Sequence, residues 1–218
     1  ISACLVGSEM CKETALNAAR EYLGPDRIPP GEAHLLAEFD GSAAGVGTEL
    51  REVTRLLRAN GAISIKPGTT EPEIEAFWQM RREFSYSLRH TGLTKLNEDV
   101  VVPRSRLVDL VEFAASLQIR SGFPVACFGH AGDGNIHVNI MVPDMKDPDQ
   151  RARADAALDD LFRHVLSLGG VISGEHGIGI AKKRWFPDAV NDAGRALHQA
   201  VKNALDPSRL LNPGKFLG

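Results

Sequence analysis

Apolar residues recur every three to four positions along several stretches of the chain, the spacing of one face of an α-helix. In other stretches they are continuous or alternate with polar residues, as in β-strands. The pattern predicts helices at about 12–23, 48–59, 71–90, 105–119, 147–168 and 187–205. It predicts strands at about 1–8, 33–39, 62–66, 99–102, 125–130, 136–142 and 171–173. Helices and strands therefore alternate along nearly the whole chain.

The order of these elements indicates the class of fold. Residues 1–66 give the order β-α-β-α-β, and residues 99–173 give β-α-β-β-α-β, the split βαβ order of ferredoxin-like folds. We therefore predict an α+β, ferredoxin-like fold with two split βαβ-type units, a mostly antiparallel sheet and a C-terminal helical tail. The chain then divides into a first half, 1–98, which includes the aromatic-rich helix, and a second half, 99–218.

Composition and charge narrow the function classes. With 218 residues and 43% apolar composition, the chain is long enough to bury roughly 70% of its unfolded surface. Its 25 basic and 28 acidic residues give a formal charge of −3, which argues against nucleic acid as a partner. The longest apolar stretches, such as 123–128, are far shorter than the roughly 18 residues of a membrane span. The three cysteines, Cys4, Cys11 and Cys127, form no C-x-x-C pair, and we expect free buried thiols.

A nine-residue segment, GHAGDGNIH at 129–137, lies between two predicted strands. Asp-Gly in this position favours a two-residue type I′ turn at 133–134. Such a turn would place His130 directly opposite His137, with their Cβ atoms roughly 5 Å apart, so that the two imidazoles could chelate a metal. Asn139 lies two residues beyond His137 and would project from the same face of the sheet.

A second segment, SGEHGIG at 173–179, places a carboxylate and an imidazole side by side among glycines. It lacks the spacing of a phosphate-binding loop. Together with His130 and His137, Glu175 would complete a set of two histidines and one carboxylate, which suits zinc, manganese or iron with positions open for a substrate. His176 would then remain as a base.

A third group consists of Arg81, Ser85 and Lys95, on and after the aromatic-rich helix. Arg81 and Ser85 are four positions apart and share a helical face. Cations on helices usually face solvent. These residues alone therefore assign no role to the group.

Four segments together resemble a known family. HAGDGNIH at 130–137, SGEHGIG at 173–179, LNPGK at 211–215 and the looser run EDVVVP at 98–103 are similar to motifs of the C-terminal domain of FAD-linked oxidases. This family belongs to the vanillyl-alcohol oxidase superfamily and includes D-lactate dehydrogenase, the glycolate oxidase D subunit and D-2-hydroxyglutarate dehydrogenase. The resemblance extends over essentially the whole chain.

The resemblance implies a function and roles for the histidine motifs. The chain would be the substrate-binding domain of an FAD-dependent enzyme that oxidises a D-2-hydroxy acid by hydride transfer to the flavin. His130, His137 and Glu175 would hold a divalent metal, in this case zinc. His176 would be the catalytic base.

The resemblance also implies contacts to the substrate. Arg81 and Lys95 would bind the substrate carboxylate and the far end of the substrate. Ser85 stands where relatives can have threonine, and Asn139 would line the pocket.

The resemblance further implies that Asn212 and Lys215 belong to a segment that returns to the flavin. The family's N-terminal FAD-binding domain is not part of this sequence, which begins with Ile1. We therefore expect a piece of a longer protein, inactive or weakly active alone, whose FAD-binding domain is a partner and holds most of the FAD.

Other expected partners are the 2-hydroxy acid and an electron acceptor such as a quinone, a cytochrome or electron-transfer flavoprotein. A homodimer is compatible with the sequence. The expected location is the cytoplasm or the inner face of a membrane.

Two other functions stay open. Without the resemblance, a self-contained metal-dependent hydrolase that uses His130, His137, Glu175 and a bound water would be about as well supported as the dehydrogenase. It predicts turnover without flavin. A ferredoxin-like binding module, in which the glycines only form turns, predicts no metal.

Overall fold

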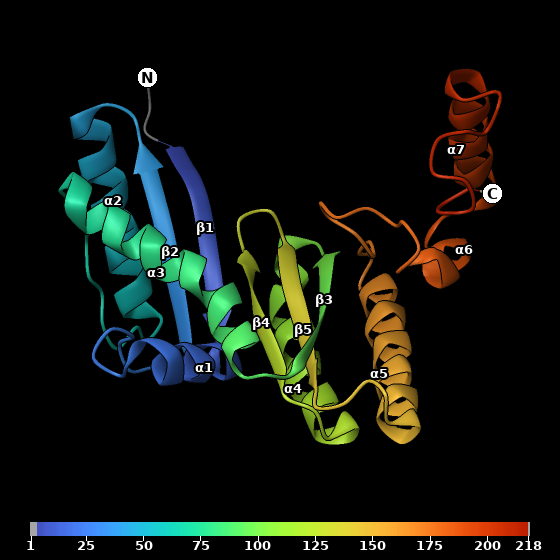
Figure 1. Ribbon diagram of the computed structural model, residues 1–218. Helices are drawn as coiled ribbons and strands as arrows, with labels where there is room; N and C mark the ends of the chain where they lie inside the picture. Colours follow the sequence, from blue (N-terminus) through green and yellow to red (C-terminus); the bar gives the residue numbers. More distant parts are fainter. Residues whose placement is uncertain (1–3, 218) are drawn as a thin grey trace.

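The computed structural model describes residues 4–217, and its centre is one five-stranded sheet (Figure 1). The strands are β1 (Cys4–Lys12), β2 (Ala33–Asp40), β3 (Thr94–Val101), β4 (Val125–His130) and β5 (Asn135–Val142), in the order β2-β1-β4-β5-β3. Each neighbouring pair of these strands is antiparallel. The predicted α+β class with a mostly antiparallel sheet is confirmed. Of the predicted first strand, residues 1–3 lie outside the described residues.

Residues 4–217 form seven α-helices: α1 (Glu13–Leu23), α2 (Ala43–Ala59), α3 (Glu71–His90), α4 (Leu107–Ser121), α5 (Pro148–Ser167), α6 (Phe186–Ala189) and α7 (Asp192–Leu205). Short 3-10 helices at Arg104–Arg106 and Lys183–Trp185 precede α4 and α6. In this part of the chain, no helix combines the length and the apolar character that crossing a bilayer requires.

Alternation of side chains along β5 divides the core into two clusters, one on each face of the sheet. Ile136 and Ile140 belong to the larger cluster, which α4 and α5 cover. Met141 belongs to the second cluster, together with Phe128 and residues of α1 and α3. His137 shares the second face because it lies an even number of positions from Met141. We call this second side of the sheet the site face.

The second half of the chain follows the predicted β-α-β-β-α-β order. Its strands are β3, β4 and β5, and the predicted strand at 171–173 is reduced to one bridge, in which Val101 and Val171 exchange backbone hydrogen bonds of 2.8 and 3.0 Å. β3 starts earlier than predicted, at Thr94, and therefore includes Lys95. The predicted boundary between the halves, at 98–99, falls inside this strand.

The first half differs from the prediction because it contributes only β1 and β2 to the common sheet. The predicted strand at 62–66 forms no strand, since these residues follow α2 and pass beside α3, where Lys66 Nζ lies 5.7 Å from the centre of the Phe77 ring. A second unit of the predicted kind is therefore absent from residues 4–66.

The predicted helix at 187–205 is interrupted after α6. Asn191 caps the start of α7, and its side chain accepts a hydrogen bond of 2.9 Å from the backbone N–H of Gly194. Residues 186–217, which we call the C-terminal arm, project beyond α5 and away from the sheet (Figure 1).

Candidate functional site

The two histidines of the first motif lie on the site face, but not directly opposite each other. β4 and β5 pair so that His130 faces Asn135 and Phe128 faces His137. The two imidazole rings are therefore diagonal neighbours, with their centroids 6.0 Å apart. The predicted direct pairing is wrong, whereas the predicted common face is correct.

The register differs because four residues, 131–134, connect the strands instead of two. A type I′ turn needs a positive φ at both central residues, and here only Gly134 has one, at 76°. The connection is also bound to its neighbours: Gly132 donates to Ser8 O at 3.3 Å, and Gly134 O accepts from Val102 N at 3.0 Å. A Cβ at Gly134 would lie 2.1 Å from Val102 O, so only glycine fits there.

Glu9 on β1 links the first histidine motif to Arg81. Strand pairing places Glu9 opposite His130. One carboxylate oxygen of Glu9 contacts His130 Nδ1, and the other accepts a hydrogen bond of 2.5 Å from Arg81 Nε. The Glu9 side chain is only 8% exposed. Because the carboxylate faces Nδ1, the proton of a neutral His130 is favoured there and Nε2 keeps its lone pair.

The second motif is wrapped around the carboxylate of Asp99, which is fully buried on β3. Asp99 accepts hydrogen bonds from the successive backbone N–H groups of residues 174–176, at 2.9, 2.6 and 2.7 Å. The Ser173 hydroxyl and the Lys182 ammonium group also donate to it. Burial alone would raise the pKa of Asp99, but these hydrogen bonds and the charge of Lys182 hold it well below its usual range. Asp99 is therefore an ionised anchor for the loop.

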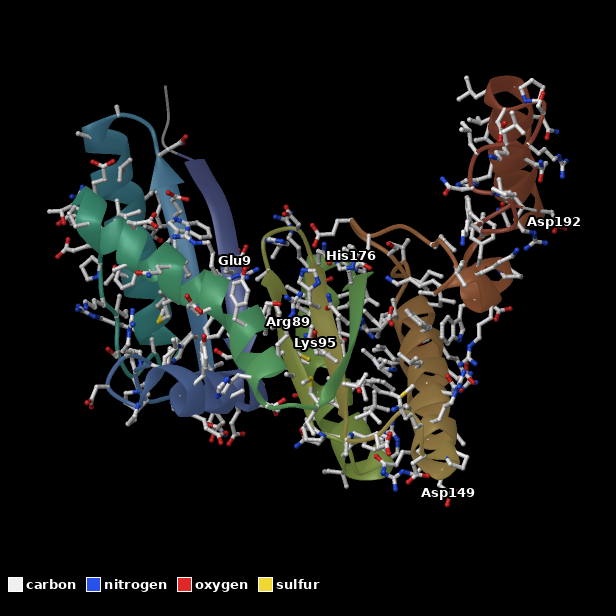
Figure 2. All side chains as sticks on the ribbon, in the orientation of Figure 1. Glu9, Arg89, Lys95, Asp149, His176 and Asp192 are labelled. Carbon is white, nitrogen blue, oxygen red and sulfur yellow. The ribbon has the colours of Figure 1, made fainter. Side chains whose placement is uncertain are left out.

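This loop presents Glu175 and His176 to the histidines of the sheet. Glu175 Oε1 lies 3.0 Å from His137 Nε2 and 3.7 Å from His176 Nε2. On its other side, His176 Nδ1 lies 3.5 Å from Asp99 Oδ1. In Figure 2, the labelled His176 and Glu9 come from this loop and from β1, on opposite sides of the β4–β5 hairpin.

Burial lowers the pKa of His137, and the nearby His176, His130 and Arg81 act in the same direction against the attraction of Glu175. The neutral imidazole is therefore favoured, which is the form that binds a metal.

His130, His137 and Glu175 each offer a donor atom, and the three atoms lie within 4.8 Å of one another. Zinc bonds of about 2.1 Å in tetrahedral geometry place donors roughly 3.4 Å apart. Glu175 Oε1 and His137 Nε2, 3.0 Å apart, are already close to this separation. The donor set, with Glu9 behind His130, therefore fits a divalent metal.

Comparison with known proteins places this chain in a family. The model of the family "FAD linked oxidases, C-terminal domain" matches residues 4–216. The chain belongs to this family.

Two curated relatives of this FAD-linked oxidase domain are long proteins. Glycolate oxidase subunit GlcD of Bacillus subtilis (strain 168) is 32% identical over 208 residues, which cover 95% of this chain and 44% of the relative. A D-lactate dehydrogenase of Anaerostipes hadrus is 30% identical over 185 residues, which cover 84% of this chain and 39% of the relative. The chain therefore spans less than half the length of these relatives.

Solved structures share the fold of this FAD-linked oxidase domain. A p-cresol methylhydroxylase with substrate bound superposes with a TM-score of 0.65 at 15% identity, covering 97% of this chain and 46% of its own. A 4-ethylphenol oxidase from Gulosibacter chungangensis gives a TM-score of 0.64 at 16% identity.

In this FAD-linked oxidase domain, the residues of α3 predicted to contact substrate point to the site face instead of to solvent. The Arg81 side chain is 16% exposed, and its Cζ lies 5.4 Å from the centre of the Phe128 ring. Ser85 Oγ accepts a hydrogen bond of 2.9 Å from Lys95 Nζ on β3. Burial, followed by the charge of Arg89, lowers the pKa of Lys95.

Asn139 lies on the site face as predicted, but fully buried. Its Nδ2 donates to Ala126 O at 3.1 Å and to His137 O at 3.0 Å, while its Oδ1 has no hydrogen-bond partner among residues 4–217. Asn139 therefore holds β4 and β5 together beneath the site.

Asn212 and Lys215 are exposed in the C-terminal arm and do not meet the other predicted residues. The segment that carries them packs against the start of the arm and the 3-10 helix before it: Lys183 Nζ donates to Gly214 O at 3.1 Å, and the centroids of the Phe186 and Phe216 rings lie 4.7 Å apart. Figure 2 marks the arm with Asp192, well away from His176.

Proposed function

We propose that this chain is the substrate-binding part of an FAD-dependent oxidoreductase that oxidises a D-2-hydroxy acid of the lactate, glycolate or 2-hydroxyglutarate class. The observation that carries the proposal is the convergence of three metal donors, within 4.8 Å of one another, with His176 and Arg81 on one face of an FAD-linked oxidase domain. Glycolate and D-lactate, which the names of two relatives contain, are both 2-hydroxy acids.

When bound, FAD supplies the hydride acceptor, and a divalent metal, which we propose to be zinc, supplies Lewis acidity at the substrate hydroxyl. His130, His137 and Glu175 would hold the metal. FAD would be held mainly by the part of the protein outside this chain, with Asn212 and Lys215 turned toward it.

His176 acts in this proposal as the base. Asp99, 3.5 Å from Nδ1, favours the tautomer with the proton at Nδ1, and Nε2 is then free to accept a proton. The substrate hydroxyl proton passes to His176 Nε2 as the α-hydrogen leaves with its electron pair as hydride. The products are the 2-oxo acid, the protonated imidazole and the reduced acceptor.

Arg81 binds the substrate carboxylate in this proposal. Glu9 is its only hydrogen-bond partner among residues 4–217 and occupies Nε, which leaves the two Nη groups for an end-on pair of hydrogen bonds to a carboxylate. Lys95, held by Ser85, would contact the far end of the substrate. Two fixed ends would hold the α-carbon in one orientation.

The test uses the full-length protein that carries this chain, loaded with FAD and kept free of oxygen. D-lactate, glycolate or D-2-hydroxyglutarate should bleach the flavin absorbance, and L-lactate should not. His176→Asn should slow the reduction by about 100-fold while substrate affinity changes little. If none of these acids reduces the flavin, the proposal is wrong, and flavin-free hydrolysis of an ester or amide would instead support the metal-dependent hydrolase.

A further inference from the structure

Lys182 is the only buried lysine among the described residues, with 3% of its surface exposed. It follows the loop that carries Glu175 and His176, and its side chain reaches back to β3. There Nζ donates to Asp99 Oδ1 and lies 3.6 Å from Glu98 Oε2. The reaction proposed above does not use this buried cation.

Lys182 contacts two carboxylates at the edge of the sheet. Glu98 and Asp99 are consecutive in β3, so their side chains leave the sheet on opposite faces. One ammonium group can contact both only at the outer edge of β3, the last strand in the sheet order. The loop attaches to the same edge, where Gly174 N donates to Asp99 O at 3.0 Å. Two adjacent buried carboxylates therefore share one cation.

The two carboxylate oxygens of Asp99 have different partners. Oδ2 accepts hydrogen bonds from the three backbone N–H groups of residues 174–176. Oδ1 accepts from Lys182 and lies 3.5 Å from His176 Nδ1. Because a carboxylate is planar, a bond that fixes one oxygen also fixes the direction of the other. Lys182 thereby sets where the loop meets Oδ2 and where His176 meets Oδ1.

The backbone of Lys182 is held by the segment that leads to α6. Its N–H donates to Ile178 O at 3.1 Å, and its carbonyl accepts from Trp185 N at 3.1 Å. Trp185 is anchored on α5, where its Nε1 donates to Asp159 Oδ1 at 2.7 Å and its ring centroid lies 4.4 Å from that of Phe162. In Figure 1 the chain leaves α5, passes over the end of β3 and turns back toward α6. Lys182 therefore connects α5 to the buried carboxylate of β3.

We propose that Lys182 is a positioning residue of the site: by fixing the carboxylate of Asp99, it holds Glu175 and His176 where the metal and the substrate hydroxyl require them. This inference rests on the proposed function. Lys182 acts through Asp99 and the loop, and it contacts neither the metal ligands of the sheet nor the substrate.

The residues proposed to bind the substrate do not depend on this link. Arg81 is held by Glu9, and Lys95 is held by Ser85. A change at Lys182 should therefore impair metal binding and proton transfer while the affinity for the substrate changes little.

The first test measures the zinc affinity of the full-length, FAD-loaded protein by isothermal titration calorimetry. Lys182→Met removes the ammonium group, and zinc affinity should fall by about 10-fold, as for other groups that orient metal ligands. Lys182→Arg keeps a cationic donor and should recover most of this loss. The matched control is Lys183→Met, because Lys183 is exposed and its Nζ bonds only Gly214 O.

A double variant separates position from charge balance and covers the case in which Lys182→Met does not fold. Adding Glu98→Gln to Lys182→Met restores the formal charge of the buried group, because one cation and one carboxylate are then lost together. Urea denaturation should show that stability recovers while zinc affinity stays low. If zinc affinity recovers together with stability, the ammonium group only balances charge and the inference is overturned.

The second test is kinetic and uses protein saturated with zinc. For whichever of D-lactate, glycolate and D-2-hydroxyglutarate reduces the flavin, Lys182→Met should lower kcat by about 10-fold and leave KM within about 2-fold. The reason is that His176 loses its support whereas Arg81 does not. An unchanged kcat, or a loss confined to KM, contradicts the positioning role.

The outcomes separate this inference from the proposed function. If one of the acids is oxidised but Lys182→Met matches the unaltered protein in zinc affinity and kcat, the inference is wrong and the proposed function stands. If none of the acids reduces the flavin but zinc affinity falls in both Lys182→Met and the double variant, the proposed function is wrong and Lys182 still positions a metal site. If the unaltered protein neither binds zinc nor oxidises any of the acids, both are wrong.

Discussion

The site face and the C-terminal arm differ in which side chains they bury and which they expose. On the site face, charged groups are buried in pairs: Glu9 with Arg81, and Asp99 with Lys182. On α7 in the arm, apolar side chains spaced four positions apart are exposed, with 65% exposure at Leu197, 50% at Val201 and 78% at Leu205.

This difference shows which region is held in place by contacts within the described residues. The buried pairs of the site face hold the histidines, Arg81 and the loop in place by contacts among β1, β3, α3 and residues 173–182. The apolar side chains of this stripe on α7 remain at least 50% exposed among residues 4–217. An amphipathic helix gains most of its stability from the surface that its apolar face covers.

The largest effect is expected from removing the loop anchor. Asp99→Ala leaves Lys182 buried without its closest countercharge and three backbone N–H groups without their acceptor, so the free energy of unfolding should fall by about 3–5 kcal/mol. Urea denaturation measures it. The matched control is Asp192→Ala in the arm, where the side chain is 94% exposed and we expect no measurable change. Equal losses in the two variants would contradict the comparison.

A smaller effect is expected when Glu9 loses its charge. Glu9→Gln keeps the size of the side chain but removes the carboxylate that orients His130, so zinc affinity should fall by 10- to 100-fold, as for other groups that orient metal ligands. Competition with a chromophoric chelator measures this affinity. Glu38→Gln, on β2, is the control. Unchanged zinc binding in Glu9→Gln would show that the carboxylate does not position the histidine.

A still smaller effect is expected from His164, on the pH dependence of the free energy of unfolding. Burial lowers the pKa of His164, whose ring stacks on Phe113 at 3.9 Å, so the unfolded chain binds more protons than the folded chain below the ordinary pKa of about 6.5. The free energy of unfolding should therefore rise between about pH 5 and pH 7. His164→Leu should reduce this rise. His198→Leu in the arm is the control, and an equal reduction there would contradict the assignment.

The smallest effect is expected in the arm itself. Replacing Leu197 and Leu205 by serine should change the free energy of unfolding of the 218-residue chain by less than about 0.5 kcal/mol, because both side chains are exposed. Thermal denaturation followed by circular dichroism measures it. A loss of several kcal/mol would mean that α7 packs on the body of the chain, and the two regions would then not differ as described.

The apolar periodicity of the sequence predicted the long helices well, and the hairpin motif predicted that the two histidines share one face of the sheet. His130 and His137 come from adjacent strands. The predicted and the observed pairings differ by two residues, and a shift of two leaves both side chains on the same face of the sheet. The register itself depended on contacts of Gly132 with Ser8 and of Gly134 with Val102, which no local pattern contains.

Glu9 could not be predicted as part of the site. It is separated from His130 by 121 positions and from Arg81 by 72, and only the pairing of β1 with β4 brings them together. The signal that could have found it is an acidic residue directly after the uncharged strand predicted at about 1–8. The same holds for Asp99, whose neighbours in the loop lie more than 70 positions away.

The two buried cysteines lie beneath opposite faces of the sheet: Cys11 under α1 and α3, and Cys127 under α4 and α5. Burial raises the pKa of both thiols, that of Cys127 to about 12, so neither is a reactive thiolate while its helices are in place. With Cys4 replaced by serine, alkylation of each thiol would time the opening of one helical layer. A single common rate would mean that both layers detach in one event, whereas two rates would give each layer its own lifetime.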